Sequence, residues 1–398
     1  GLRSPLCAMV LLAYHTVITY FLGNGDGNSE YAEKILEPCI KLFPKGAIFL
    51  YYRGRVKHVD GDLDEAVVKY HESITSQSEW KQFHHLCYWE LMWCYCFKCD
   101  WKEAYSFARK LLKESRWSAC SYMYFCAVFK LMGRIDPKCG AFTNEKETEE
   151  EKEEFLFRKA PELKQRLAGK SIPFEKFSVS RCKDYFEKKR YLWLPALELI
   201  LLWNGFRILY KRPDLVKNLL ELVHESQRKQ SSTRSDGYVY KIEDVCLLKL
   251  LEGMCVRCLN KKELALISFQ QVLTHESEFT EDSYIAAYTC AEIGFMHLDY
   301  GDVTTGKHYL ETAHKKYHGY LLENRLRFRI HGALQDLECN KYNPPQFVAA
   351  DDNDGKKEVN SESVATNSSE ETSDGNVVNT QSRVSSIVEI KRFKETSV

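Results

Sequence analysis

The sequence lacks an excess of charge of either sign. Its 398 residues carry 56 Lys and Arg against 56 Asp and Glu, so no global charge draws the chain to nucleic acid or to an anionic membrane. It also lacks a long apolar run. The most apolar segment, Cys7 to Leu22, contains 16 residues, whereas a membrane span needs about 20. We therefore predict no nucleic-acid partner and no transmembrane segment, and we interpret Cys7 to Leu22 as a buried first helix.

Catalytic motifs are also missing. Gly169-Lys170-Ser171 resembles the end of a phosphate-binding loop, but the first glycine of that motif would fall at Lys164, and no strand precedes it. Ser, His, Asp and Cys do not occur at the spacing of a nucleophilic triad, and no glycine-rich dinucleotide loop follows a strand. We predict that the protein is not an enzyme, with no catalytic residue and no cofactor.

Cysteine, in contrast, is abundant. The 15 cysteines are odd in number, lie within apolar helical stretches and follow no signal peptide, which favours reduced thiols in a cytoplasmic protein. Six residues of metal-ligand type crowd one segment: His84, His85, Cys87, Cys94, Cys96 and Cys99. A zinc site needs four convergent ligands, and no second Cys pair has a matching spacing. We interpret these cysteines as buried core thiols and one turn cysteine, and we predict no metal site.

Helical periodicity dominates the chain from about residue 4 to residue 338. Within it one spacing recurs: a Gly, then an Ala twelve residues on, an aromatic four further and a small residue three beyond. Such a Gly and Ala let two antiparallel helices approach closely, and the aromatic fills the space beside them. The copies are Gly54, Ala66, Tyr70 and Ser73; Gly253, Ala265, Phe269 and Val272; and, more loosely, Gly294, Gly306, Leu310 and Ala313.

This spacing is the framework of the tetratricopeptide repeat, a helix–turn–helix of about 34 residues. One such unit cannot bury its apolar face alone, so the units stack into a solenoid with an extended groove. The fold class that we predict is all-α, a right-handed α-solenoid of degenerate tetratricopeptide repeats with a disordered C-terminal tail.

Two composition shifts divide the chain. Residues 146–154 are mostly glutamate, and residues 346–382 are rich in Ser, Thr, Asn, Asp and Glu. Like charges repel one another in the first stretch, and the second cannot bury enough apolar surface to offset chain entropy. The predicted organisation is N-terminal repeats in 1–132, a flexible acidic insertion in 133–154, C-terminal repeats with a capping helix in 155–339, and a disordered tail in 340–398.

The repeat register also predicts which side chains face the groove. They are the second, fifth, ninth and twelfth residues of each first helix, and they lack the Lys and Asn that clamp a partner's carboxylate. We expect an apolar, aromatic groove that holds an amphipathic helix or an extended hydrophobic segment, with Trp89 and Trp93 as anchors. The alternative is that these aromatics pack against the protein's own helices. The candidate groove residues are Tyr51, Arg55, Trp89, Trp93, Met254 and Phe295, and Leu86 occupies a further groove position.

The C-terminal residues carry a second candidate site. Glu395, Thr396 and Val398 match the pattern that PDZ domains recognise, in which a hydroxyl residue stands two before a terminal Val. The peptide adds a strand to the domain, its carboxylate enters a nest of N–H groups, and the Val fills an apolar pocket. We therefore predict a PDZ-domain protein as a second partner.

Eight stretches, taken in order, give the chain a specific resemblance. It resembles the animal tetratricopeptide repeat protein 39 family, which is related to a fungal inclusion-body-clearance protein. The resemblance implies a non-catalytic protein with roles in lipid homeostasis or protein turnover, and a C-terminal fragment of a longer chain. The stretches are Pro44 to Leu50, Trp80 to His85, Cys87 to Cys94, Glu114 to Ser118, Ala168 to Pro173, Leu194 to Glu198, Trp203 to Gly205 and Asn324 to Ile330.

These observations together predict a cytoplasmic interaction scaffold or adaptor that captures a hydrophobic or helical segment. The alternative is a peripheral membrane or lipid-binding helical protein, located at a membrane or lipid droplet, whose aromatic cavity holds lipid. A sealed apolar cavity would favour the lipid alternative, and an open groove would favour the peptide.

Overall fold

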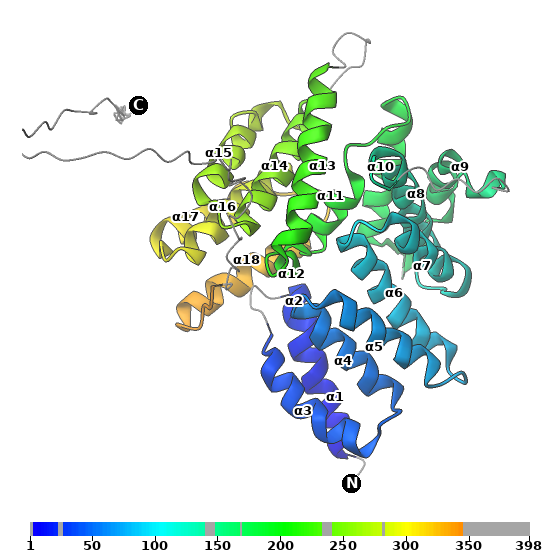
Figure 1. Ribbon diagram of the computed structural model, residues 1–398. Coiled ribbons are helices and arrows are strands. Elements are labelled where there is room, and N and C mark those ends of the chain that lie inside the picture. The colour runs from blue at the N-terminus through cyan, green and yellow to red at the C-terminus, as the bar shows by residue number, and fades with distance from the viewer. Residues whose placement is uncertain are drawn as a thin grey trace, which may run out of the picture. The chain divides into compact units, whose positions relative to one another are not determined.

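The structure is a computed structural model that describes residues 3–22, 27–139, 148–167, 169–232, 241–280 and 283–344. These residues are almost entirely helical (Figure 1), which confirms the all-α repeat fold. Within them, no helix combines the length and the apolar character that crossing a membrane requires. The helices are α1 (Arg3–Ala13), a π-helical turn (Tyr14–Ile18), α2 (Thr19–Leu22), α3 (Ser29–Leu42), α4 (Ala47–Val59), α5 (Leu63–Thr75), α6 (Lys81–Phe97), α7 (Trp101–Glu114), α8 (Ala119–Ile135), α9 (Glu153–Lys159), α10 (Pro173–Glu187), α11 (Pro195–Leu202), α12 (Phe206–Leu209), α13 (Pro213–Ser232), α14 (Ile242–Cys258), α15 (Lys262–Leu273), α16 (Ile285–Asp299), α17 (Val303–Lys316) and α18 (Glu323–Glu338).

The helix pairs α4–α5, α6–α7, α14–α15 and α16–α17 are the most closely packed units. Their contact follows from the spacing seen in the sequence. A Cβ built on Gly54 would lie 2.6 Å from the ring of Tyr70, and one on Gly253 would lie 2.4 Å from the ring of Phe269. Both rings are fully buried. Glycine is therefore required where the aromatic of the second helix crosses the first.

The second helix of three pairs starts in the same way. Asp62, Asp100 and Asp302 each accept a hydrogen bond from the backbone N–H three residues on, which satisfies one of the free donors of the first turn. These caps fix the residue at which the second helix of each pair begins.

The described parts of the predicted acidic insertion, residues 133–139 and 148–154, differ from the flexible segment expected from the sequence. Helix α8 continues to Ile135, and Glu149–Glu151 form a 3-10 turn followed directly by α9. Glu151 pairs with Arg109 of α7, while Glu153 accepts from Arg134 at 2.9 Å and from the Tyr185 hydroxyl at 2.7 Å. Opposite charges on neighbouring helices thus hold residues 148–154 in place, whereas residues 140–147 lie outside the described residues.

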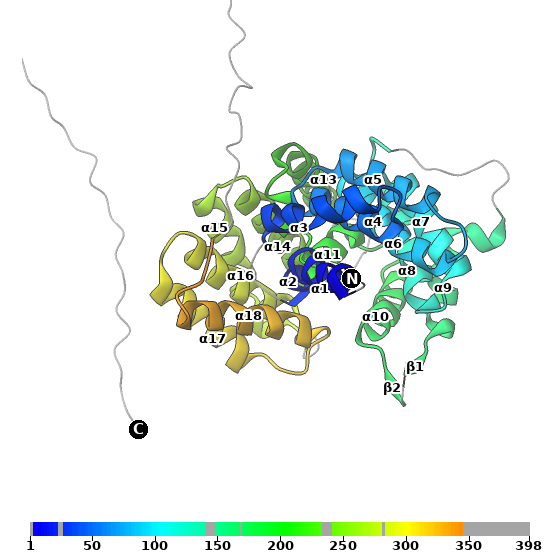
Figure 2. The ribbon, with the colours of Figure 1, turned by 90° about the horizontal axis from the view of Figure 1, so that it is seen from below.

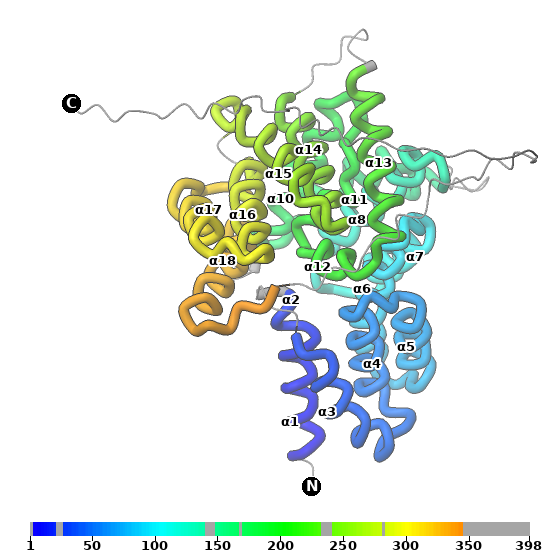
Figure 3. The backbone as a smooth tube through the Cα atoms, turned by 60° about the vertical axis from the view of Figure 1, so that its left-hand side comes forward, coloured from blue at the N-terminus to red at the C-terminus, as the bar shows by residue number. Residues whose placement is uncertain are grey.

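A short hairpin of β1 (Arg166–Leu167) and β2 (Lys170–Ser171) precedes α10 and projects beyond it (Figure 2). Helix α2 packs against α18, so the end of the first helical segment touches the last helix of the described residues (Figure 3). The tail predicted for 340–398 lies outside the described residues from 345 onward.

Candidate partner-binding groove

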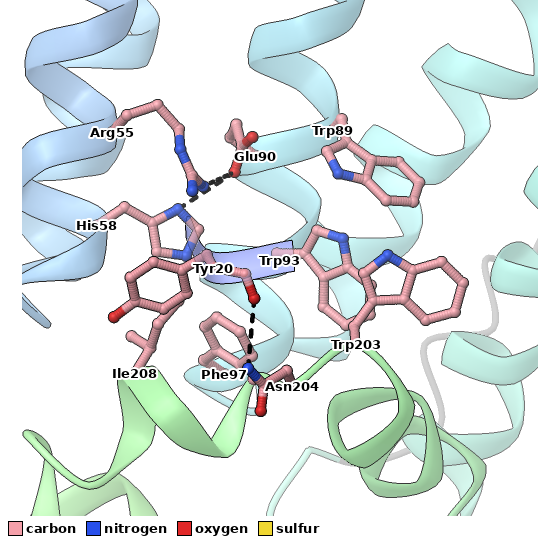
Figure 4. A pocket seen from close by; sticks show the side chains of 11 residues that line it. Tyr20, Arg55, His58, Trp89, Glu90, Trp93, Phe97, Trp203, Asn204 and Ile208 are labelled. Atoms are coloured by element: carbon pink, nitrogen blue, oxygen red, sulfur yellow. Dashed lines mark hydrogen bonds and ion pairs between the residues drawn. The ribbon is translucent and has the colours of Figure 1, made fainter. Parts of the chain in front are cut away.

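The groove positions of α4 meet a buried glutamate of α6. Arg55 donates from Nη1 to Oε2 of Glu90 at 2.6 Å (Figure 4). The Tyr51 hydroxyl donates to Oε1 of Glu90 at 3.3 Å. Arg55 also donates from Nε to the carbonyl oxygen of Thr16 at 3.2 Å. Thr16 lies in the π-helical turn between α1 and α2. The predicted groove is therefore filled at Arg55 by a helix of the same chain, and Arg55 is only 4% exposed.

Histidine and glutamate titrate abnormally in this network. Burial lowers the pKa of His58, so its ring is neutral near pH 7. Burial alone would raise the pKa of Glu90, but the charge of Arg55 and the hydrogen bond from His58 outweigh it, and the pKa of Glu90 is lowered. Glu90 is thus an anion held between a permanent cation and a neutral imidazole.

Trp89 and Trp93 belong to a cluster of aromatic rings. The Trp93 ring centroid lies 5.9 Å from that of Trp89 and 5.6 Å from that of Trp203, which follows α11. The Phe174 ring meets Trp203 at 4.3 Å. Trp93 is buried, whereas Trp89 is half-buried and contacts Phe125 with 5.6 Å between ring centroids. Rings from α6, α8, α10 and the α11–α12 turn therefore cover the second stretch of the predicted groove.

A small cavity of about 40 Å³ lies beside this cluster, lined by Tyr20, His58 and Trp93 among others. Within the described residues, Nε2 of His58 and Nε1 of Trp93 have no hydrogen-bond partner. Such a volume has room for a water molecule but is far below the roughly 300 Å³ of a ligand pocket. The Tyr20 carbonyl beside it accepts from Asn204 at 3.3 Å, which joins α2 to the α11–α12 turn.

Met254 and Phe295, the groove candidates of the C-terminal repeats, are both buried. The guanidinium of Arg329 in α18 stacks on Phe295, 4.6 Å from the ring centroid. The same guanidinium forms an ion pair with Glu292 at 2.8 Å, and Arg257 of the preceding repeat forms another at 2.5 Å. Helix α18 thus covers Phe295 as the π-helical turn covers Arg55, and in both places a buried glutamate pairs with an arginine.

The concave side is open near the start of α6. There a cleft of about 1040 Å³ lies between α6 and the connection from α7 to α8. Trp117 is 84% exposed in it and Leu86 is 46% exposed, while Trp89 lies where the cleft meets the aromatic cluster. We call this surface the Trp117 cleft. Its lining residues are Lys81, Gln82, His84, His85, Leu86, Tyr88, Trp89, Glu114, Ser115, Arg116, Trp117 and Tyr122.

Of the candidate groove residues, the structure thus exposes Trp89 in part and buries Tyr51, Arg55, Trp93, Met254 and Phe295. The repeat register does not select Trp117, since it would be the first residue of a first helix and that position does not face the groove. In the structure Trp117 precedes α8, which begins at Ala119. One sequence feature did indicate that Trp117 is exposed: its neighbours are Arg116 and Ser118, and polar neighbours do not favour burial.

The cysteine segment contains buried thiols. Cys87, Cys94 and Cys96 are buried within α6, and burial raises the pKa of Cys87 to about 12. Among the described residues, no three His, Cys, Asp or Glu side chains are grouped closely enough to hold a metal ion. The PDZ-like residues Glu395, Thr396 and Val398 lie outside the described residues.

Comparison with known proteins gives one family. The model of the family described as Iml2/Tetratricopeptide repeat protein 39 matches residues 1–259. The Tetratricopeptide repeat protein ttc-39B of Caenorhabditis elegans is 33% identical over 338 residues, which are 85% of this chain and 56% of that protein. The chain therefore spans about half the length of this curated relative. A crystal structure of a tetratricopeptide repeat protein from Parabacteroides merdae is 12% identical, with a TM-score of 0.30, over 81% of this chain and 98% of that one.

Proposed function

Because the chain belongs to the Iml2/Tetratricopeptide repeat protein 39 family, we propose that it is a protein-interaction scaffold that captures an apolar or helical segment of a partner in the Trp117 cleft. Stacked helical repeats present extended concave surfaces, which is how proteins of this architecture bind their partners. The scaffold is non-catalytic, and its place is the cytoplasm.

The observation that supports this proposal is the contrast between two stretches of one concave face. At Arg55 the face holds an apolar helix of its own chain, so its shape suits a helix. At the Trp117 cleft the same face presents exposed Trp117 and Leu86 beside half-buried Trp89. Exposed tryptophan at a concave site is typical of the residues that dominate binding energy at protein interfaces. Trp89 then contacts the partner, and buried Trp93 supports it from behind.

The other groove candidates have supporting roles in this proposal. Arg55 binds the π-helical turn through the Thr16 carbonyl, and Tyr51 donates to Glu90 beside it. Phe295 packs against Arg329 of α18, and Met254 is buried in the core. They set the shape of the repeats that flank the cleft, and they do not touch the partner.

Proximity labelling in cells tests the proposal. The variant is Leu86→Ala/Trp117→Ala, and its matched control is Leu264→Ala/Phe328→Ala, which removes two apolar side chains that are exposed elsewhere. We expect a set of partners to be lost from the cleft variant and kept by the control. An unchanged set in the cleft variant, with the fold intact by circular dichroism, would contradict the proposal.

A second candidate function is peripheral membrane or lipid binding, and the observation that favours it is one face of α1 and the π-helical turn that follows it. Leu6, Val10, Tyr14 and Ile18 recur every fourth residue there and are between 43% and 69% exposed. Sedimentation with phosphatidylcholine/phosphatidylserine vesicles tests it through Val10→Asp. Sedimentation of the wild type but not of Val10→Asp would support membrane contact. If neither protein sediments with the vesicles, this alternative is wrong.

We also propose that the C-terminal Glu395, Thr396 and Val398 recruit a PDZ-domain protein. Deleting Val398 is expected to remove PDZ-domain proteins from the labelled set and to leave the partners of the Trp117 cleft in place. Retention of every PDZ-domain protein after the deletion would contradict this second contact.

A further inference from the structure

Two cations that form no ion pair among the described residues border the Trp117 cleft. Lys81 and Arg116 are exposed, and neither forms an ion pair within the described part of the chain. Glu114 is the one carboxylate among the lining residues, and it lies 3.7 Å from Nε2 of His85. The charge that the cleft offers to a partner is therefore positive.

Two further features add to this positive character. Lys110 of α7 lies over the ring of Tyr88, with its Nζ 5.5 Å from the centroid, and Tyr88 lines the cleft. Lys81 is the first residue of the 17-residue helix α6, whose N-cap residue, Trp80, makes no side-chain capping bond. The N-terminus of a helix carries partial positive charge, so α6 reinforces the attraction of Lys81 for an anion.

The apolar surface of the cleft lies directly beside these cations. Arg116 is the immediate neighbour of Trp117, and Lys81 lies just over one helical turn before Leu86 on α6. A ligand that covers Trp117 or Leu86 thus brings its neighbouring residues within reach of a cation. Charge complementarity of this kind selects among partners that share the same apolar anchor.

From this arrangement we infer that the partner segment carries Asp or Glu within about one helical turn of a bulky apolar side chain. The apolar side chain covers Trp117 and Leu86, and the carboxylate faces Lys81 or Arg116. This inference rests on the proposed function and specifies the chemistry of the segment that the scaffold captures.

Selection from a phage-displayed library of random 16-residue peptides, panned on the full chain, tests the inference. We expect enriched peptides to combine Asp or Glu with Trp, Phe, Leu or Ile. In fluorescence anisotropy with a labelled enriched peptide, Trp117→Ala is expected to raise Kd roughly tenfold or more, as for an interface anchor. Lys81→Glu/Arg116→Glu is also expected to raise Kd roughly tenfold or more, because both contacts become repulsive.

The matched control is Lys45→Glu/Lys217→Glu, which changes the net charge equally at two exposed lysines outside the cleft. We expect it to leave Kd within about twofold, because charges beyond a Debye length of about 10 Å are screened. An equal loss in this control would mean non-specific attraction and would overturn the inference.

Two other results separate the inference from the function on which it rests. If enriched peptides lack acidic residues and depend on Trp117 but not on Lys81 and Arg116, the inference is wrong and the proposed function stands. If no peptide is enriched, or if Trp117→Ala leaves Kd unchanged, both fail.

Discussion

Replacing Glu90 by Ala is expected to destabilise the N-terminal repeats strongly, because it leaves the charge of Arg55 buried and unpaired. Arg55 is 4% exposed, and its Nη1 is 2.6 Å from Glu90. Removing one partner of a buried ion pair costs about 3–5 kcal/mol of unfolding free energy. The hydroxyl of Tyr51 loses its acceptor as well, which adds about 1 kcal/mol.

Removing both charges is expected to cost less than removing one. The double variant Arg55→Met/Glu90→Leu no longer has a charge to desolvate, and apolar side chains of similar volume pack in its place. Its remaining costs are the loss of the bonds from Arg55 to the Thr16 carbonyl, about 1–2 kcal/mol, and of the Tyr51 acceptor, about 1 kcal/mol as in Glu90→Ala. The double variant should therefore be more stable than Glu90→Ala by roughly 2 kcal/mol.

Hydrogen exchange of α4 and α6, followed by mass spectrometry, measures both effects locally. In Glu90→Ala, protection of the slowest amides is expected to fall roughly a hundredfold or more, since each 1.4 kcal/mol is about tenfold. The amides of α16 serve as the internal control, because repeats contact mainly their neighbours. Protection in the double variant that equals or falls below that of Glu90→Ala would refute the reasoning.

Three further predictions concern packing, protonation and thiol chemistry. Gly253→Ala should lower the unfolding free energy by about 1–2 kcal/mol in urea titration, since overpacking against Phe269 outweighs the helix propensity of Ala; a gain in stability would contradict the close contact. Burial lowers the pKa of His58 from 6.5, so the unfolded chain binds a proton that the folded chain does not, and stability should fall as the pH drops below about 6.5. His58→Gln should reduce the dependence of the unfolding free energy on pH between about pH 7 and pH 5. An unchanged dependence would mean that another group binds the proton. Cys7 and Cys339 are the exposed thiols, while Cys39, Cys99 and Cys139 are half-buried, so Ellman's reagent should label about two thiols rapidly in the native protein. Cys7→Ser/Cys339→Ser should lose this rapid phase, and its persistence would show that half-buried or core thiols are accessible.

The repeat fold could be predicted from the sequence because its determinants are local. Gly54 meets Tyr70 and Gly253 meets Phe269 within one helix pair, over a separation of 16 residues. When two antiparallel helices are joined by a short turn, the contacting glycine and aromatic residue keep the same separation in the sequence. The contact can therefore be recognised as a recurring spacing. The family resemblance also rests on such short stretches.

Which groove residues are buried and which are exposed could not be predicted in the same way. The register places Trp93 on the concave face, but Trp203, more than a hundred residues later, is among the rings that cover it. The bond between Asn204 and Tyr20 spans 184 residues. Contacts of such length leave no periodic signal in a single sequence. The exposure of Trp117 has the same origin, since it depends on the path of the connection between α7 and α8.

The helix α1–α2, held at Arg55 through the carbonyl of Thr16, is a tethered competitor for its stretch of the groove. Residues 23–28 link it to α3, and a link this short keeps the local concentration of a segment near the millimolar range. A partner helix at about micromolar concentration would need roughly a thousandfold higher intrinsic affinity to take its place. Weak, reversible ligands therefore do not displace α1–α2 from the groove at Arg55, because the tethered segment is present at the higher local concentration.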